Sequence, residues 1–136
     1  MNDIVINKIQ SIQRCILRAR EELALAGDRF AEDFSRQDAA VLNVTRACEQ
    51  AIDLANHVVR VRQLGIPQSS ADAFDLLACA GIIPPELATR LRRMIGFRNI
   101  AMHTYQVMEL AIVAAIIRTG LDDLVALGDA VLALEP

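Results

Sequence analysis

The residues VLNVTRACEQAIDLANHVV, positions 41–59, indicate the fold class, because their apolar side chains recur at intervals of three and four. In a helix of 3.6 residues per turn, this spacing places the apolar side chains on one stripe and most polar side chains elsewhere. We expect Ser35 to cap the helix and the helix to continue to about Leu64. The predicted stripe consists of Val41, Val44, Cys48, Ala51, Ile52, Ala55, Val58 and Val59.

Four further helices are predicted around this one. The first ends near Gly27, before the helix of residues 41–59. After a break at LGIPQSS (64–70), a short helix spans about 71–79 with Ser69 or Ser70 as its cap. The next begins at Pro84 or Pro85, and the last spans about 107–134. No stretch of useful length alternates with a period of two. The sequence therefore predicts an all-α protein, an up-and-down bundle of four long helices with a short third helix between them.

Length and composition narrow the class of protein. The 136 residues predict a single domain covering 1–136. The net charge of −3 provides no overall positive field for nucleic acid. Three widely spaced cysteines favour neither disulfides nor zinc, and the chain has no compact cluster of metal ligands, so we predict no metal or cofactor. With neither a secretory signal nor a membrane-spanning run, we expect a soluble cytoplasmic protein.

The last predicted helix is apolar on nearly all sides between Leu110 and Ile117. One face of a small bundle needs less apolar surface than this. Hydrophobic residues also reach 54% of the chain. We therefore predict a homodimer that buries the surplus.

The stretch GFRNIAMHTYQ, residues 96–106, brings Arg98, His103 and Tyr105 together in a chain with two histidines and one tyrosine. On a continuous helix, His103 lies roughly 140° around the axis from Arg98. Asn99 shares a face with His103 and could orient its imidazole ring. Arg98 and His103 could converge if the helix ended near Met102, or if a two-fold axis brought two copies of the motif together.

Charge gathers next to this motif. From Glu86 to Tyr105, four arginines face one acid, a local balance of +3, and Arg90, Arg92 and Arg93 are therefore candidates for phosphate binding. Residues 106–136 have a balance of −4, and Asp122 and Asp123 are expected on a solvated helix face. Asp53 and His57 lie on the predicted polar face of residues 46–60, which is either a solvated or dimer-facing stripe or a second wall of the cleft.

The spacing Arg98, four residues, His103, one residue, Tyr105 resembles the R-x4-H-x-Y signature of HEPN domains. The blocks ACEQAIDLANHVV, LGIPQSS and GFRNIAMHTY, in this order, are similar to the HepT branch of that superfamily. The resemblance covers essentially the whole chain and implies the HEPN-like helical bundle.

The resemblance also implies a function. HepT-like proteins are dimeric, metal-independent endoribonucleases and act as toxins of type VII toxin-antitoxin pairs. Their partner is an MntA-like nucleotidyltransferase antitoxin, which adenylylates the motif tyrosine. By this resemblance, His103 would be the general acid/base, Arg98 the phosphate-binding group, Asn99 its polar support and Tyr105 the modified residue.

The residue types suit such chemistry, because RNA carries its own nucleophile in the 2′-hydroxyl group. An imidazole can transfer that proton at neutral pH, and a guanidinium can stabilise the charge that develops on the phosphate. Two other functions stay open. The chain could be a non-catalytic helical adaptor that binds a minimal nucleotidyltransferase, or an oligomerisation module without chemistry, with Arg98, His103 and Tyr105 as ordinary structural residues.

Overall fold

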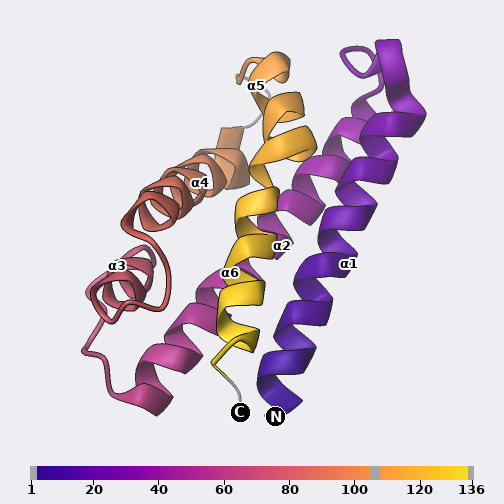
Figure 1. The fold of residues 1–136 in the computed structure, drawn as a ribbon. Helices are drawn as coiled ribbons and strands as arrows, with labels where there is room; N and C mark the ends of the chain where they lie inside the picture. The colour runs from indigo at the N-terminus through magenta and orange to yellow at the C-terminus, as the bar shows by residue number, and fades with distance from the viewer. Residues whose placement is uncertain (1–2, 105–107, 135–136) are drawn as a thin grey trace.

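The computed structural model describes residues 3–104 and 108–134, and every regular element in them is helical. The elements form the predicted up-and-down bundle of four long helices with a short third helix, which confirms the fold class (Figure 1). They are α1 (Asp3–Ala26), the 3₁₀ turn η1 (Gly27–Arg29), α2 (Phe34–Arg62), α3 (Asp72–Cys79), α4 (Pro85–Thr104), α5 (Leu110–Ala115), the π-helical segment η3 (Ile116–Gly120) and α6 (Asp122–Leu132).

The long helix α2 contacts most other elements of the bundle. It packs along α1, and α3, α4 and α6 also contact it. Figure 1 shows α1 beginning and α6 ending at the same end of the bundle. The predicted stripe of α2 is buried throughout, and Val44, Cys48, Ala51 and Ala55 have no exposed surface. Burial of this stripe supplies the main driving force that holds α2 at the centre.

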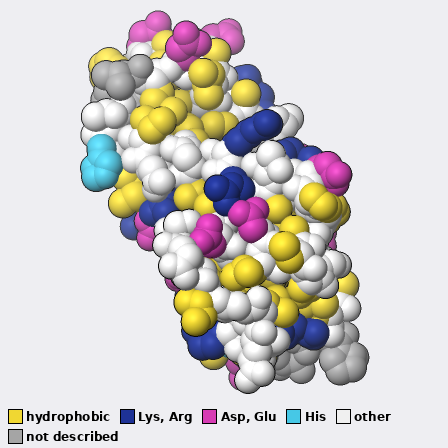
Figure 2. All heavy atoms as spheres, turned by 90° about the vertical axis from the view of Figure 1, so that its left-hand side faces the viewer, with side chains coloured by type: hydrophobic (Ala, Val, Ile, Leu, Met, Phe, Trp, Pro, Cys, Tyr) yellow, Lys and Arg dark blue, Asp and Glu magenta, His cyan; other side chains and the backbone are white. Residues whose placement is uncertain are grey.

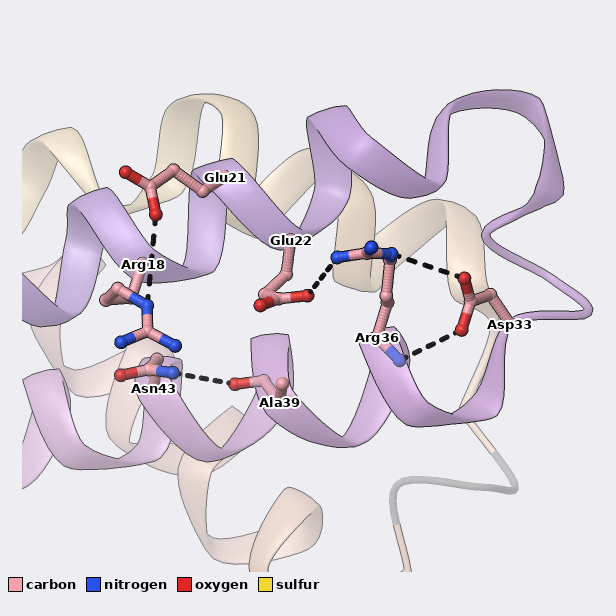
Figure 3. A network of polar contacts seen from close by, with 7 residues as sticks. All are labelled: Arg18, Glu21, Glu22, Asp33, Arg36, Ala39 and Asn43. Carbon is pink, nitrogen blue, oxygen red and sulfur yellow. Dashed lines mark hydrogen bonds and ion pairs between the residues drawn. The ribbon is translucent and has the colours of Figure 1, made fainter.

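The turn between α1 and α2 is held by charged side chains (Figure 3). Asp33 caps α2, because its Oδ1 accepts a hydrogen bond of 3.1 Å from the backbone N of Arg36. The Arg36 guanidinium also lies 2.9 Å from Glu22 of α1 and 3.4 Å from Asp33. The prediction that Ser35 caps this helix is therefore wrong by two residues, since a carboxylate that also binds Arg36 occupies the capping position.

The capping prediction for the third helix is also wrong. Ala71 occupies the N-cap position of α3, and its side chain accepts no hydrogen bond. Asp72, in the first turn, instead accepts a bond of 2.7 Å from the backbone N of Gln68. The turn before α3 is therefore stabilised by the Asp72 carboxylate and not by a serine hydroxyl.

The predicted last helix is interrupted by the π-helical segment η3. Arg20 of α1 stabilises this segment: its Nε donates to the carbonyl of Ile117 at 2.9 Å and its Nη2 to the carbonyl of Arg118 at 3.2 Å. The same Nη2 lies 2.8 Å from Asp122. Asp123 pairs with Arg90 of α4 at 3.0 Å. Asp122 is exposed, as predicted, whereas Asp123 is partly buried, and both residues form ion pairs with arginines of other helices.

None of the helices in the described ranges is both long and apolar enough to cross a membrane.

Candidate active site

Helix α4 carries the Arg98 and His103 pair and continues to Thr104. It begins at Pro85, where the fixed backbone angle of proline suits a first helical turn. Its apolar residues Leu87, Leu91 and Met94 are buried. Because α4 does not end near Met102, the first route to convergence is wrong, and Arg98 and His103 stay roughly 140° apart around the helix axis.

Arg98 lies against α2, with only 12% of its side chain exposed. Its Nη1 is 3.6 Å from Oε1 of Glu49 and donates to Sδ of Met102 at 3.4 Å. The Nε atom is buried and has no acceptor among the described residues. A guanidinium has five N–H donors, and a thioether is a weak acceptor. Arg98 is therefore a largely buried cation that uses little of its hydrogen-bonding capacity on the described residues.

Cys48 lies beneath this cation in α2 and is fully buried, which confirms its predicted place in the core. Burial raises the pKa of the Cys48 thiol to about 12, the Arg98 charge lowers it by less, and the Glu49 charge adds to the rise. The thiol is therefore neutral at physiological pH. A neutral, buried thiol is a poor nucleophile, so Cys48 contributes packing to this site and not chemistry.

His103 is exposed in the last turn of α4, where it lines a pocket of about 460 Å³ between α4 and α2. Among the described residues, seven line this pocket: Asp38, Val41, Leu42, Thr45, Ala101, Met102 and His103. Met102 contacts Arg98 and also lines the pocket, so Arg98 lies next to it. Asn99 is exposed one helical turn before His103, on the same face of α4, as predicted.

The α2 residues that contact Arg98 or line the pocket with His103 come from a single face of that helix. Asp38, Thr45 and Glu49 are spaced by seven and four residues, so they follow one line along the helix. Arg98 and His103 thus lie along the same face of α2, although they leave α4 in different directions. Sequence reasoning did not connect Asp38 or Met102 with Arg98 and His103. The position of Asp38 in the helix predicted from Ser35 to about Leu64 was visible in the sequence, but the crossing of α2 and α4 was not.

Two of the three candidate phosphate-binding arginines form ion pairs within the chain. Arg90 pairs with Asp123, while Arg92 pairs with Asp75 and lies 3.9 Å from Asp72. Figure 2 shows this face of the molecule, on which basic and acidic side chains lie next to one another. The positive field predicted beside the motif is therefore partly neutralised. Arg93 is exposed and lines a separate hollow of about 200 Å³ with Phe97.

Asp53 and His57 lie away from the Arg98 and His103 pair in this chain. Asp53 pairs with Lys8 of α1 at 3.3 Å. His57 is only 8% exposed, faces residues of α1 and α6 such as Val5, and lies 3.2 Å from Arg60 through its Nδ1. The prediction that His57 belongs to an exposed polar face is therefore wrong. A wall formed by these two residues would have to come from another copy of the chain.

Tyr105 lies outside the described residues, so its predicted role stays a prediction. Phe74 and Phe97 are buried and pack in the core.

Known proteins share both the sequence and this architecture. Residues 12–131 match the family model "Ribonuclease HepT-like". The chain is 49% identical over 123 residues to the mRNA nuclease HepT of Shewanella oneidensis, covering 90% of this chain and 92% of that protein. A toxin-antitoxin crystal structure with AMP-PNP matches with a TM-score of 0.92 and 45% identity, covering 97% of this chain and 99% of that one.

A second solved structure is the tri-AMPylated Shewanella oneidensis HEPN toxin in complex with the MNT antitoxin. It matches with a TM-score of 0.91 and 46% identity, covering 98% of this chain and 99% of that one. The bundle and the Arg98 to His103 spacing therefore define an all-α protein of the HEPN class. Within that class, the chain belongs to the HepT-like ribonuclease family, which confirms the resemblance.

Proposed function

We propose that this protein is the toxin of a type VII toxin-antitoxin pair and acts as a metal-independent endoribonuclease. The observation that carries the proposal is the largely buried Arg98 guanidinium beside the His103 pocket, whose Nε has no acceptor among the described residues. Such a cation is suited to bind an anion, because an incoming phosphate would supply the missing acceptors. A relative at 49% identity is an mRNA nuclease, which supports RNA as the substrate.

Arg98 would bind the scissile phosphate. The pentacoordinate phosphorus carries more negative charge than the ground state, and a guanidinium held in a partly dehydrated place stabilises that increase. Glu49 is 47% exposed and sits 3.6 Å away, beyond hydrogen-bonding distance, so it limits the motion of Arg98 without occupying its donors. The phosphate can therefore bind without first displacing a strong partner.

His103 would transfer the protons. In the first half of the reaction, an imidazole removes the proton from the 2′-hydroxyl group, whose oxygen attacks phosphorus while the P–O5′ bond breaks. The leaving O5′ takes up a proton from a His103 imidazolium, and the products are a 2′,3′-cyclic phosphate and a 5′-hydroxyl end. Asn99, on the exposed face one turn earlier, would steady the imidazole ring.

The second copy of the chain would complete the site. Within one chain, Arg98 and His103 leave α4 in different directions, so a two-fold axis beside α4 offers a shared cleft. The surface supports such an axis, because Ile100 and Ile112 are about half exposed near the end of α4 and in α5. Figure 2 shows hydrophobic side chains exposed on the face that looks left in Figure 1. The exposed side chains of Ile100 and Ile112 would be covered in a homodimer.

Expression of the protein without an antitoxin is expected to arrest bacterial growth, and the purified protein is expected to cleave RNA at the same rate with or without EDTA. Metal-independent cleavage follows from a mechanism in which Arg98 and His103 supply the charge and the proton transfer. End analysis should find a cyclic phosphate. Loss of cleavage in EDTA, with recovery on adding Mg²⁺, would contradict the mechanism, and growth without arrest would favour the adaptor function.

Tyr105 would be the regulatory position, adenylylated by a partner MntA-like nucleotidyltransferase. Each AMP group adds bulk and one phosphodiester charge, which would compete with RNA for the positive charge of Arg98. A solved relative is a tri-AMPylated toxin bound to its antitoxin, which supports a modification of this kind.

Replacing Tyr105 by phenylalanine is expected to prevent neutralisation by the catalytic activity of the antitoxin, because phenylalanine has no hydroxyl to accept AMP. Co-expression with the partner enzyme and intact mass measurement provide the readout. The wild-type chain should gain mass in steps of AMP and lose toxicity, whereas the variant should gain none and stay toxic. A variant that is still modified and neutralised would show that another residue is the acceptor.

A further inference from the structure

The pocket beside His103 has a chemical character that phosphate binding does not explain. Its floor is apolar, built from Val41, Leu42, Ala101 and Met102. Asp38, Thr45 and His103 are the polar residues of its lining. A volume of about 460 Å³ lies in the usual range for sites that hold small molecules or parts of them. Apolar walls with a few polar groups are also typical of such sites.

The position of this pocket relates it to the proposed reaction. His103 forms part of its wall, and Met102 connects it to the Arg98 guanidinium through the 3.4 Å contact with Sδ. If Arg98 binds the phosphate and His103 transfers the proton, the nucleotide next to the scissile bond lies beside the pocket entrance. RNA that is recognised in single strands presents bases turned out of the stack, free to enter such a space.

Asp38 determines which part of the nucleotide can enter. Its carboxylate is exposed in the first turns of α2 and carries a negative charge, so it repels a phosphate group. A carboxylate offers only acceptors, and its ligand must therefore present N–H or O–H donors. A planar base edge with N–H groups above an apolar floor meets both requirements, because the ring covers Leu42 and Met102 while its edge reaches Asp38.

The four bases differ in the donors on this edge. Guanine presents N1–H and the exocyclic amine side by side, which two carboxylate oxygens can accept together. Adenine and cytosine each present one amine next to a ring nitrogen acceptor, which a carboxylate repels. Uracil presents one N–H between two carbonyl acceptors. A carboxylate in this place therefore favours guanine over the other three.

We infer that the pocket between α2 and α4 is a nucleobase subsite, in which Asp38 selects guanine in the nucleotide adjacent to the scissile phosphate. The inference rests on the proposed ribonuclease function and adds to it a residue that determines specificity. Asp38 acts on the base and not on the reacting atoms. The expected preference is about tenfold, corresponding to one to two hydrogen bonds with a charged acceptor in a partly exposed site.

The test uses oligouridine strands that carry one central G, A, C or U and compares single-turnover cleavage rates next to that position. The wild-type protein should cleave beside G about tenfold faster than beside the other three. Asp38→Ala should reduce this preference to less than about twofold, while its rate on the all-uridine strand stays within about threefold of wild type. Glu21→Ala is the control, since it removes an exposed carboxylate from α1, outside the pocket lining, and should keep the preference.

A strand with inosine in place of guanosine gives a second test on the unmodified protein. Inosine keeps N1–H and lacks the exocyclic amine, so its rate should fall between those for guanosine and uridine. This comparison decides the question even if Asp38→Ala does not fold.

The outcomes separate the two proposals. A wild-type protein that cleaves none of the strands contradicts the ribonuclease function itself. Equal cleavage of all four strands, or a guanine preference that survives Asp38→Ala, leaves the ribonuclease intact and overturns the subsite. If Asp38→Ala instead leaves the preference unchanged and weakens the dimer or the antitoxin complex, the pocket binds protein and the inference is wrong.

Discussion

Replacing Arg98 by alanine is expected to lower the RNA-cleavage rate about 10³-fold and to abolish toxicity, because removal of one preorganised donor for transition-state charge costs about two to three orders of magnitude. The effect should appear in kcat as well as in KM, since the phosphate gains charge after binding. Arg98→Lys should recover little activity, because an ammonium group cannot present the two parallel donors of a guanidinium. Single-turnover rates on a defined RNA strand provide the measurement.

Folding controls make this result interpretable. Among the described residues Arg98 has no acceptor for its buried Nε, and its ion pair with Glu49 is long, so its removal costs little polar interaction. Because only 12% of its side chain is exposed, the substitution also removes packing, and the thermal midpoint should fall while the protein stays folded. The mass by light scattering should match that of the wild type, which we expect to be a dimer at micromolar concentration. Arg14→Ala, which removes an exposed arginine of α1, is the matched control and should keep full activity. An active Arg98→Ala variant would contradict the proposed role.

The helical pattern of the sequence predicted much of the fold because it reports burial directly. Val44 and Cys48 follow the 3.6-residue period of α2, and both are fully buried. The position of Arg98 was predictable for the same reason, since it continues the stripe of Leu91 and Met94 on α4 and its side chain is mostly covered. A residue whose surroundings are set by its own helix can be placed from local spacing alone.

Features that depend on distant residues were not predictable in this way. The π-helical segment η3 is stabilised by Arg20, about a hundred positions earlier in the chain, which satisfies carbonyls that an α-helix would pair internally. His57 follows the polar side of α2 in sequence, yet α1 and α6 cover it. The pocket beside His103 likewise needs two helices, because Asp38 comes from α2 and His103 from α4. Periodicity describes one helix at a time and contains no information on such crossings.

Replacing His103 by alanine is expected to lower the cleavage rate by about 10² to 10⁴-fold, the usual contribution of a positioned general acid or base. His103 is exposed at the end of α4, so the substitution removes no buried contact, and the thermal midpoint should be unchanged. Binding of an RNA strand should also be nearly unchanged, because the positive charge that binds the phosphate belongs to Arg98.

A 2′-deoxy substitution on the substrate tests the same step without changing the protein. If the 2′-hydroxyl is the nucleophile, a strand with one deoxynucleotide before the scissile phosphate should bind with similar affinity and remain uncut at that position, while neighbouring positions are still cleaved. The wild-type protein with the deoxy strand and His103→Ala with the ribose strand should then both fail to cleave at this phosphate, for two independent reasons. The deoxy strand lacks the nucleophile, and the variant lacks the group that deprotonates it. Cleavage of the deoxy position at the ribose rate would require a water nucleophile and would remove the reason for placing His103 beside the 2′-hydroxyl.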